Sequence, residues 1–162
     1  MAIDKSFLEK FIKTTEFAAY GASPFIGKGN KNGADKGAVD KMRSELNTID
    51  MKATIVIGEG EMDEAPMLHI GEKVGTNNGP EFDIAVDPLE GTTFTSKGLP
   101  NAFSVLAVTE KGNLLSAPDT YMEKIIIGSN LPKNLLDLDN GVEKNINLLA
   151  RAKNKKISEI SA

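Results

Sequence analysis

The stretch "DIAVDPLEGTT", residues Asp83–Thr93, passes from an apolar run into acids, a proline, a glycine and two hydroxyls. Its run Ile84–Val86 is typical of a strand that is covered on both faces. Pro88 lacks an amide hydrogen and predicts the end of that strand. Asp87 and Glu90 would then lie at the strand's carboxyl end, where open α/β sheets commonly bind ligands. The stretch therefore predicts an α/β fold with a polar site at this end.

The composition favours a globular, cytoplasmic protein. With 162 residues, of which 40% are hydrophobic, the chain can bury a sizeable core, and we expect one domain over residues 1–162. The formal net charge of −4 argues against a surface for nucleic acid. The absence of cysteine excludes disulfides and thiolate metal ligands. No segment approaches the ~20 apolar residues that span a bilayer, so we expect no membrane partner.

The periodicity of apolar residues predicts a series of helices and strands. The first predicted helix begins with a capping box at Ser6 and Glu9 and ends at Gly21. A glycine-rich loop over 27–35 follows, and then a helix with Val39, Met42 and Leu46 on one face. After it we expect a strand over 54–58 and a helix that ends near Gly75. After the strand around 84–86 we expect two strands linked around Lys111–Asn113, a strand in "MEKIIIG" (122–128) and a helix over 142–151.

Three groups of acids follow loops or strands. Asp35 lies in the glycine-rich loop, Glu59 and Glu61 follow one predicted strand, and Asp87 and Glu90 follow another. Two carboxylates 4 Å apart repel by ~1 kcal/mol in water and ~4 kcal/mol at an effective dielectric of 20, so a cluster needs compensation. A hard cation, Mg²⁺ or Mn²⁺, would supply it through oxygen ligands. The alternative, in which each acid lies singly at a solvated loop tip, stays open.

Gly91, Thr92 and Thr93 combine close backbone approach with hydroxyl groups, and their amides could bind a phosphate oxygen. Together with the acids they favour metal-assisted phosphate chemistry, in which Thr92, oriented by Asp35, aligns an attacking water. The alternative for the two threonines is an ordinary turn that caps the next element.

Four strings in order, "GNKNGAD", "TIVIGEGEMDEAPML", "DIAVDPLEGTT" and "APDTYMEK", resemble the class II fructose-1,6-bisphosphatases through most of the chain. The pattern "DPLEGT" is also similar to that of the wider lithium-sensitive sugar and inositol phosphatases. The resemblance implies a layered α-β sugar-phosphatase fold, with a mixed sheet flanked by helices. It implies hydrolysis of the 1-phosphate of fructose 1,6-bisphosphate by metal-activated water, a step of gluconeogenesis, with Mg²⁺ or Mn²⁺ and often a homo-oligomer.

The resemblance also implies roles for particular residues. The metal ligands would be Asp35, Glu59, Asp87 and Glu90, and the residues that activate water would be Asp35 and Thr92. The substrate contacts would be Glu90, Gly91, Thr92 and Tyr121, whose phenol can hydrogen-bond a phosphate or a sugar hydroxyl.

The chain departs from the family's pattern in two places. Asn30 stands where the family's loop often has an acid, which removes a charge near the site. The sequence also corresponds only to the family's N-terminal portion, and the later half would supply a further acidic ligand and the basic residues for the distal phosphate. Two alternatives therefore stay open: a noncatalytic fragment or subunit that needs a complementing half, and a phosphatase for another sugar or inositol phosphate.

Overall fold

The computed structural model describes residues 3–59, 67–116 and 122–161. The chain divides into two compact units, residues 1–117 and residues 118–162, and each is described by itself. The expected single domain over residues 1–162 stays a prediction.

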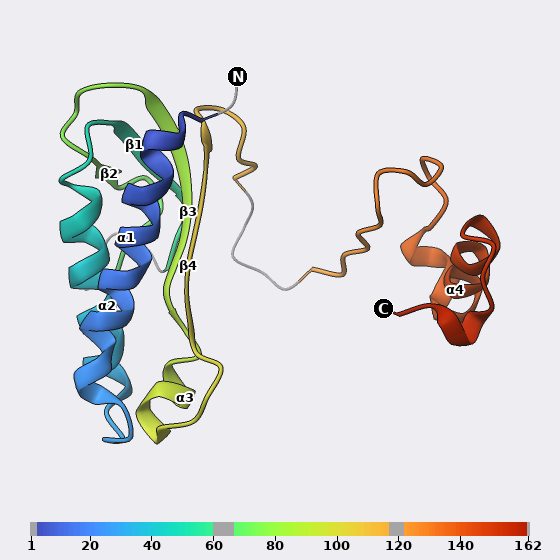
Figure 1. The fold of residues 1–162 in the computed structure, drawn as a ribbon, viewed down its shortest axis with the longest axis horizontal. Helices are drawn as coiled ribbons and strands as arrows, with labels where there is room; N and C mark the ends of the chain where they lie inside the picture. The colour runs from blue at the N-terminus through green and yellow to red at the C-terminus, as the bar shows by residue number, and fades with distance from the viewer. Residues whose placement is uncertain (1–2, 60–66, 117–121, 162) are drawn as a thin grey trace. The chain divides into compact units, whose positions relative to one another are not determined.

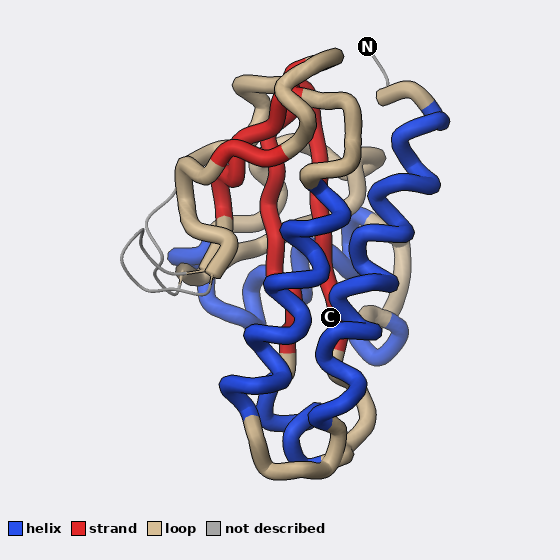
Figure 2. Tube along the Cα trace, turned by 90° about the vertical axis from the view of Figure 1, so that its left-hand side faces the viewer, coloured by secondary structure: helices blue, strands red, loops and turns tan. Residues whose placement is uncertain are grey.

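The first unit has two long helices that lie side by side against one face of a sheet (Figures 1 and 2). Helix α1 spans Lys5–Ala22 and helix α2 spans Lys31–Leu46, with a 3₁₀ turn at Ser23–Phe25 between them. The predicted capping box at Ser6 is wrong, because Asp4 caps α1 and accepts a hydrogen bond from the amide of Ser6 at 2.7 Å. No helix in the described part of the chain is long and apolar enough to cross a membrane.

The sheet has the order β2-β1-β3-β4. Its strands are β1 (Lys52–Ile57), β2 (Lys73–Val74), β3 (Glu81–Glu90) and β4 (Phe103–Glu110), and the short helix α3 (Thr92–Lys97) follows β3. Strands β1 and β3 are parallel, whereas β2 and β4 run antiparallel to their neighbours. The predicted α/β class and mixed sheet are therefore confirmed.

The core lies between the two helices and the sheet. Val39, Met42 and Leu46 of α2 are fully buried, as their shared helical face predicts, and they belong to one cluster with Ile55 and Ile84 of the central strands. Near the start of β3, the ring of Phe82 packs edge-on against the rings of Phe7 and Phe11 of α1, with centroid distances of 5.2 and 6.1 Å. Burial of such apolar side chains contributes roughly 1.5–3 kcal/mol each.

Three predictions for the first unit need correction. Asp35 does not lie in the glycine-rich loop, because α2 already begins at Lys31. Pro88 does not end its strand, because β3 continues to Glu90 through a register shift. No helix ends near Gly75, because the described residues 67–75 run beside β1 and form a turn and β2. There the amide of Gly71 donates to the carbonyl of Ile55 at 2.7 Å.

The second unit contains helix α4 (Gly141–Ala152) with 3₁₀ turns at Leu138–Asn140 and Ile157–Glu159, and the predicted helix over 142–151 is confirmed. In the first unit, the strand predicted after Asn113 is wrong for the described residues 114–116, which have no regular structure. In the second unit, the strand predicted over 122–128 is likewise absent from the described residues. A strand needs a neighbour for its backbone hydrogen bonds, and none of the described segments of this unit is a strand.

The backbones of α1 and α2 touch at a pair of glycines. A Cβ atom on Gly21 would collide with the carbonyl oxygen of Gly37, and one on Gly37 would collide with the carbonyl oxygen of Gly21. Because each obstacle is backbone, a side chain at either position forces the helices apart. This contact sets the distance between α1 and α2 at Gly37, two residues after Asp35.

We expect Gly37→Ala to lower the free energy of unfolding by about 2 kcal/mol, since overpacking outweighs the ~1 kcal/mol that alanine gains in helix propensity. Urea unfolding followed by far-ultraviolet circular dichroism measures it, because the chain has no tryptophan. The control is Asn32→Ala at an exposed position of the same helix, with an effect within about 0.5 kcal/mol. A Gly37→Ala variant as stable as the natural chain would contradict the close contact.

Candidate functional site

An irregularity in β3 brings Asp87 and Glu90 to the same place. In a regular strand, residues three apart point to opposite faces. The pairing of β3 with β4 shifts its register between these two residues, and Pro88 and Leu89 in between are buried. The amide of Leu89 donates to the carboxylate of Asp87 at 3.1 Å, which fixes that side chain. The bulge therefore turns both acids toward one site.

Glu59 follows β1, the parallel neighbour of β3, so it lies at the same end of the sheet. Its amide donates to the carbonyl of Leu68 at 3.2 Å, and a Cβ atom on Gly58 would collide with that same carbonyl oxygen. The chain that returns at residue 67 therefore packs directly onto the backbone that carries Glu59. Glu61 lies outside the described residues.

Arg43, for which the sequence suggested no role, ties this returning chain to α2. Its guanidinium holds the carboxylate of Glu72 with two hydrogen bonds, of 2.7 and 3.1 Å, and it also donates to the carbonyl of Met67. His69 lies in this loop, with its Nδ1 3.2 Å from a carboxylate oxygen of Glu72. An arginine on a helix carries no sequence signal for such a contact, because its partners are distant in the chain.

Asp35 reaches the site from the second turn of α2. Asn30 caps this helix by accepting a hydrogen bond from the amide of Gly33 at 2.8 Å, a role that asparagine and aspartate share. The loop before it is fastened to α3, since the amides of Gly27 and Gly29 donate to carbonyls of that helix at 2.9 and 2.8 Å. The segment after β3 thus holds the segment that carries Asp35.

The four acids act on one another electrostatically. Burial is the largest cause that raises the pKa of Glu59 to about 7, and the charges of Asp35, Asp87 and Glu90 add to it. Burial also raises the pKa of Asp87 to about 6, together with a hydrogen bond and repulsion from Glu90. Burial raises the pKa of Asp35 as well. The structure therefore brings these four residues together, and their charges lack compensation.

The donor chemistry of this cluster fits a hard divalent cation. Oδ1 of Asp35 and Oε2 of Glu59 are buried and have no hydrogen-bond partner among the described residues. Carboxylate oxygens are the ligands that Mg²⁺ and Mn²⁺ prefer. Across residues 3–59, 67–116 and 122–161, no three His, Cys, Asp or Glu side chains are already arranged around a point where an ion would fit. The expected ligand set of Asp35, Glu59, Asp87 and Glu90 thus remains a prediction.

Gly91 and Thr92 lie directly beyond the acids. Gly91 has a φ of 86° and leads into α3, and Thr92 is half-buried at the first position of that helix. The amides of Phe94 and Thr95 donate to the carbonyl of Gly91 at 2.8 and 3.1 Å, which closes a tight turn. The alternative interpretation of the two threonines, a turn that leads into the next element, is therefore confirmed. This turn directly follows Glu90 in the chain. Tyr121 lies outside the described residues.

Comparison with known proteins shows which family the chain belongs to. The family model described as "Bacterial fructose-1,6-bisphosphatase, glpX-encoded" matches residues 5–162. The chain belongs to this bisphosphatase family. The resemblance to class II fructose-1,6-bisphosphatases is thereby confirmed.

Individual relatives support the same family. It is 51% identical over 152 residues to fructose-1,6-bisphosphatase 1 class 2 of Escherichia coli (strain K12), covering 94% of this chain and 45% of that protein. It is 49% identical over 152 residues to fructose-1,6-bisphosphatase class 2 of Haemophilus influenzae, with the same coverage. The chain thus spans less than half the length of these relatives. Among solved structures, an extragenic suppressor from Pyrococcus furiosus aligns with a TM-score of 0.44 and 20% identity, covering 66% of this chain and 41% of that one.

The raised pKa values predict how stability depends on pH without metal. A carboxyl whose pKa rises from 4.5 to about 7 on folding stabilises the folded state below pH 4.5, and this contribution is lost as the pH rises through 7. In EDTA at pH 8, we expect Glu59→Gln to be more stable than the natural chain by on the order of 1 kcal/mol, after allowance for solvent exposure. At pH 5 the difference shrinks.

Urea unfolding between pH 4.5 and 8 measures this difference. If the cluster binds a cation, we expect Mn²⁺ at pH 8 to stabilise the natural chain by mass action and to stabilise Glu59→Gln less. Parallel stability curves for the two proteins across this pH range, with no response to Mn²⁺, would show that Glu59 is not in a charged cluster.

Proposed function

We propose that this chain carries the metal-binding and water-positioning part of a fructose-1,6-bisphosphatase. The observation that supports this most is the convergence of Asp35, Glu59, Asp87 and Glu90 beside the turn at Gly91, in a chain of this family. The reaction is hydrolysis of the 1-phosphate of fructose 1,6-bisphosphate to fructose 6-phosphate and phosphate, a step of gluconeogenesis.

The residues would share the work as follows. The four carboxylates hold Mg²⁺ or Mn²⁺, and such an ion supplies positive charge that lowers the pKa of a water and offsets the charge of the phosphate. Asp35 orients the hydroxyl of Thr92, which aligns the attacking water with phosphorus. The oxygen of the water bonds to phosphorus while the bond from phosphorus to the sugar oxygen breaks. The sugar oxygen keeps the electron pair of that bond and takes up a proton, and the water gives up one, so the products are phosphate and a sugar hydroxyl. Glu90, Gly91, Thr92 and Tyr121 contact the substrate.

Two features of the site support these roles. Asp35 and Glu59 each have a buried carboxylate oxygen without a hydrogen-bond partner among the described residues, and such an oxygen is free to bind a cation. The pKa values of Glu59 and Asp87, raised to about 7 and about 6, put part of the cluster in its protonated form near neutral pH, so a bound cation competes with protons there. Metal affinity, and with it phosphate release, would therefore rise with pH through this range.

A second candidate is a subunit that becomes active only with a complementing half. It is favoured by the match to 45% of the length of the E. coli relative. A substrate with two phosphates also needs basic partners, and the later half of the family is expected to supply them. Another sugar or inositol phosphate is the third possibility. A cytoplasmic location and a homo-oligomer remain predictions.

Phosphate release tests the proposal. Fructose 1,6-bisphosphate is incubated with Mn²⁺ or Mg²⁺ and with this chain, alone and mixed with the C-terminal half of the E. coli relative. In the active arrangement, Asp87→Ala and Glu90→Ala should each lower the rate by on the order of 100-fold or more. The control is Asp40→Ala on α2. The carboxylate of Asp40 is exposed and pairs with Lys36 at 2.6 Å, so this substitution should leave the rate unchanged.

The outcomes separate the candidates. Phosphate release by the chain alone supports an enzyme that is active without a partner. Release only from the mixture supports a subunit that needs a complementing half. If phosphate is released faster from an inositol phosphate or another sugar phosphate than from fructose 1,6-bisphosphate, that compound becomes the proposed substrate. Full turnover by Asp87→Ala, or no release in any arrangement, would refute the assignment.

A further inference from the structure

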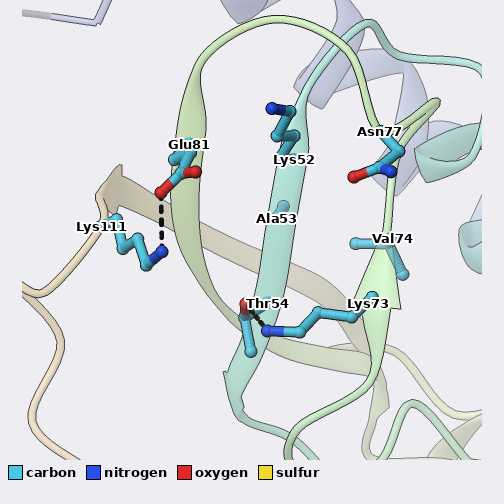
Figure 3. A pocket seen from close by; sticks show the side chains of 9 residues that line it. Lys52, Ala53, Thr54, Lys73, Val74, Asn77, Glu81 and Lys111 are labelled. Carbon is cyan, nitrogen blue, oxygen red and sulfur yellow. Dashed lines mark hydrogen bonds and ion pairs between the residues drawn. The ribbon is translucent and has the colours of Figure 1, made fainter.

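A second polar site lies at the end of the sheet opposite to the acids. Here a cavity of about 380 Å³ opens where β1 and β3 begin and β2 passes beside them (Figure 3). Its charged and polar lining consists of Lys52, Thr54, Lys73, Asn77, Glu81 and Lys111. None of these residues belongs to the acid cluster.

The sheet register places these side chains on one face. Lys52 of β1 pairs with Glu81 of β3, and Thr54 of β1 pairs with Lys73 of β2. Residues that are directly opposite in neighbouring strands point to the same side of a sheet, as do residues two apart in one strand. The hydrogen-bonded register therefore fixes the spacing of the backbone positions from which these side chains reach the cavity.

Positive charge exceeds negative charge around this cavity. Lys111 pairs with Glu81 at 2.7 Å, and the ammonium group of Lys73 donates one hydrogen bond, of 2.6 Å, to the hydroxyl of Thr54. In the described part of the chain, the ammonium group of Lys52 makes no hydrogen bond or ion pair. The pKa of Glu81 is lowered first by Lys111 and then by Lys52 and Lys73, so all three cations act on this one carboxylate.

Asp83 adds one further negative charge nearby. It acts on Lys111 electrostatically, but its own carboxylate accepts a hydrogen bond from the amide of Gly112 at 2.6 Å. Three ammonium groups thus face two carboxylates, one of them buried and already occupied. The two lysines of β1 and β2 retain donors for a further anion.

The segment that carries Gly75 and Asn77, which line the cavity, is held against Met51, the residue directly before β1. The amide of Asn77 donates to the carbonyl of Met51 at 3.2 Å, and a Cβ atom on Gly75 would collide with that carbonyl oxygen. Asn77 has a φ of 63°, and its side chain lies over the cavity (Figure 3). In Figure 3 the side-chain oxygen of Asn77 points toward the lysines, so its nitrogen offers a neutral donor there after the amide turns about its Cβ–Cγ bond.

We propose that this cavity binds a small metabolite through a phosphate group, held by the ammonium groups of Lys52 and Lys73 and by the side-chain amide of Asn77. Lysines act as point charges toward phosphate, and charge-assisted hydrogen bonds of this kind are about twice as strong as neutral ones. The volume is at the lower end of ligand pockets, roughly 300–1,000 Å³, which suits a small molecule. Glu81 competes with the phosphate for the lysines. The site is independent of the proposed hydrolysis.

Amide chemical shifts of the ¹⁵N-labelled chain test this inference. Inorganic phosphate is titrated in EDTA at pH 7, with ionic strength held constant by chloride. Without metal, the acid cluster repels phosphate. We expect saturable shifts at Thr54, Lys73, Asn77 and Glu81. Lys52→Gln and Lys73→Gln should each weaken binding about three- to tenfold, the loss of one partly solvated ionic contact.

Glu81→Gln should instead tighten phosphate binding severalfold, because it removes the competing carboxylate and frees Lys111. Opposite effects of neighbouring surface substitutions cannot arise from misfolding. The control is Lys41→Gln, an exposed lysine of α2 that does not line the cavity, which should leave the affinity unchanged.

The remaining outcomes are decisive. Shifts confined to Gly91–Phe94 would assign the phosphate to the proposed catalytic site and overturn the inference, as would shifts that never saturate. Equal weakening by Lys41→Gln would reduce the effect to net charge and overturn it too. A parallel titration with glycerol 3-phosphate identifies the source: tighter binding than inorganic phosphate indicates a phosphate ester, and weaker binding indicates the free ion.

Discussion

The parallel pairing of β1 with β3 is the constraint on which both polar sites depend. Parallel strands point their carboxyl ends to the same edge of a sheet, so whatever follows β1 meets whatever follows β3. Glu59 and the pair Asp87 and Glu90 are neighbours for this reason. The same pairing gathers the strands' amino ends, where Lys52 lies opposite Glu81. One register therefore separates negative charge at one end from positive charge at the other.

The acid cluster is maintained against its own repulsion by backbone contacts. Carboxylates without a counterion move apart unless the chain that bears them is held. A bulge aims Asp87 and Glu90, a close backbone contact at Gly58 holds Glu59, and the cap and loop of α2 hold Asp35. Burial without compensation raises the pKa values of three of these groups, which is a cost to the folded state. Such a cost is typical of sites that await a charged ligand.

The supporting contacts link segments that lie far apart in the sequence. Arg43 joins α2 to the chain after residue 67, and the amides of Gly27 and Gly29 join the loop before α2 to α3. Each contact connects two segments that bear or adjoin an acid of the cluster. The first unit thus carries the means of positioning these four residues within itself. The chain spans 45% of the length of the E. coli relative, and basic partners for a distal phosphate remain a prediction for the part that it does not cover.

The sequence by itself determined the class of fold, the long helices, the central strands and the family, because these follow from periodicity and from ordered local motifs such as "DPLEGT". It also named the acids as candidates, since each follows a strand or a glycine-rich stretch. Only the tertiary structure decided that Asp35 approaches from a helix, that β3 continues past Pro88, and that residues 67–75 form a turn and a strand. The first outcome follows from the local Asn30 cap, which the sequence-based prediction left out. The other two depend on pairing with distant backbone, as does the lysine-lined cavity, whose members come from four separate segments. Local sequence carries no record of such partners.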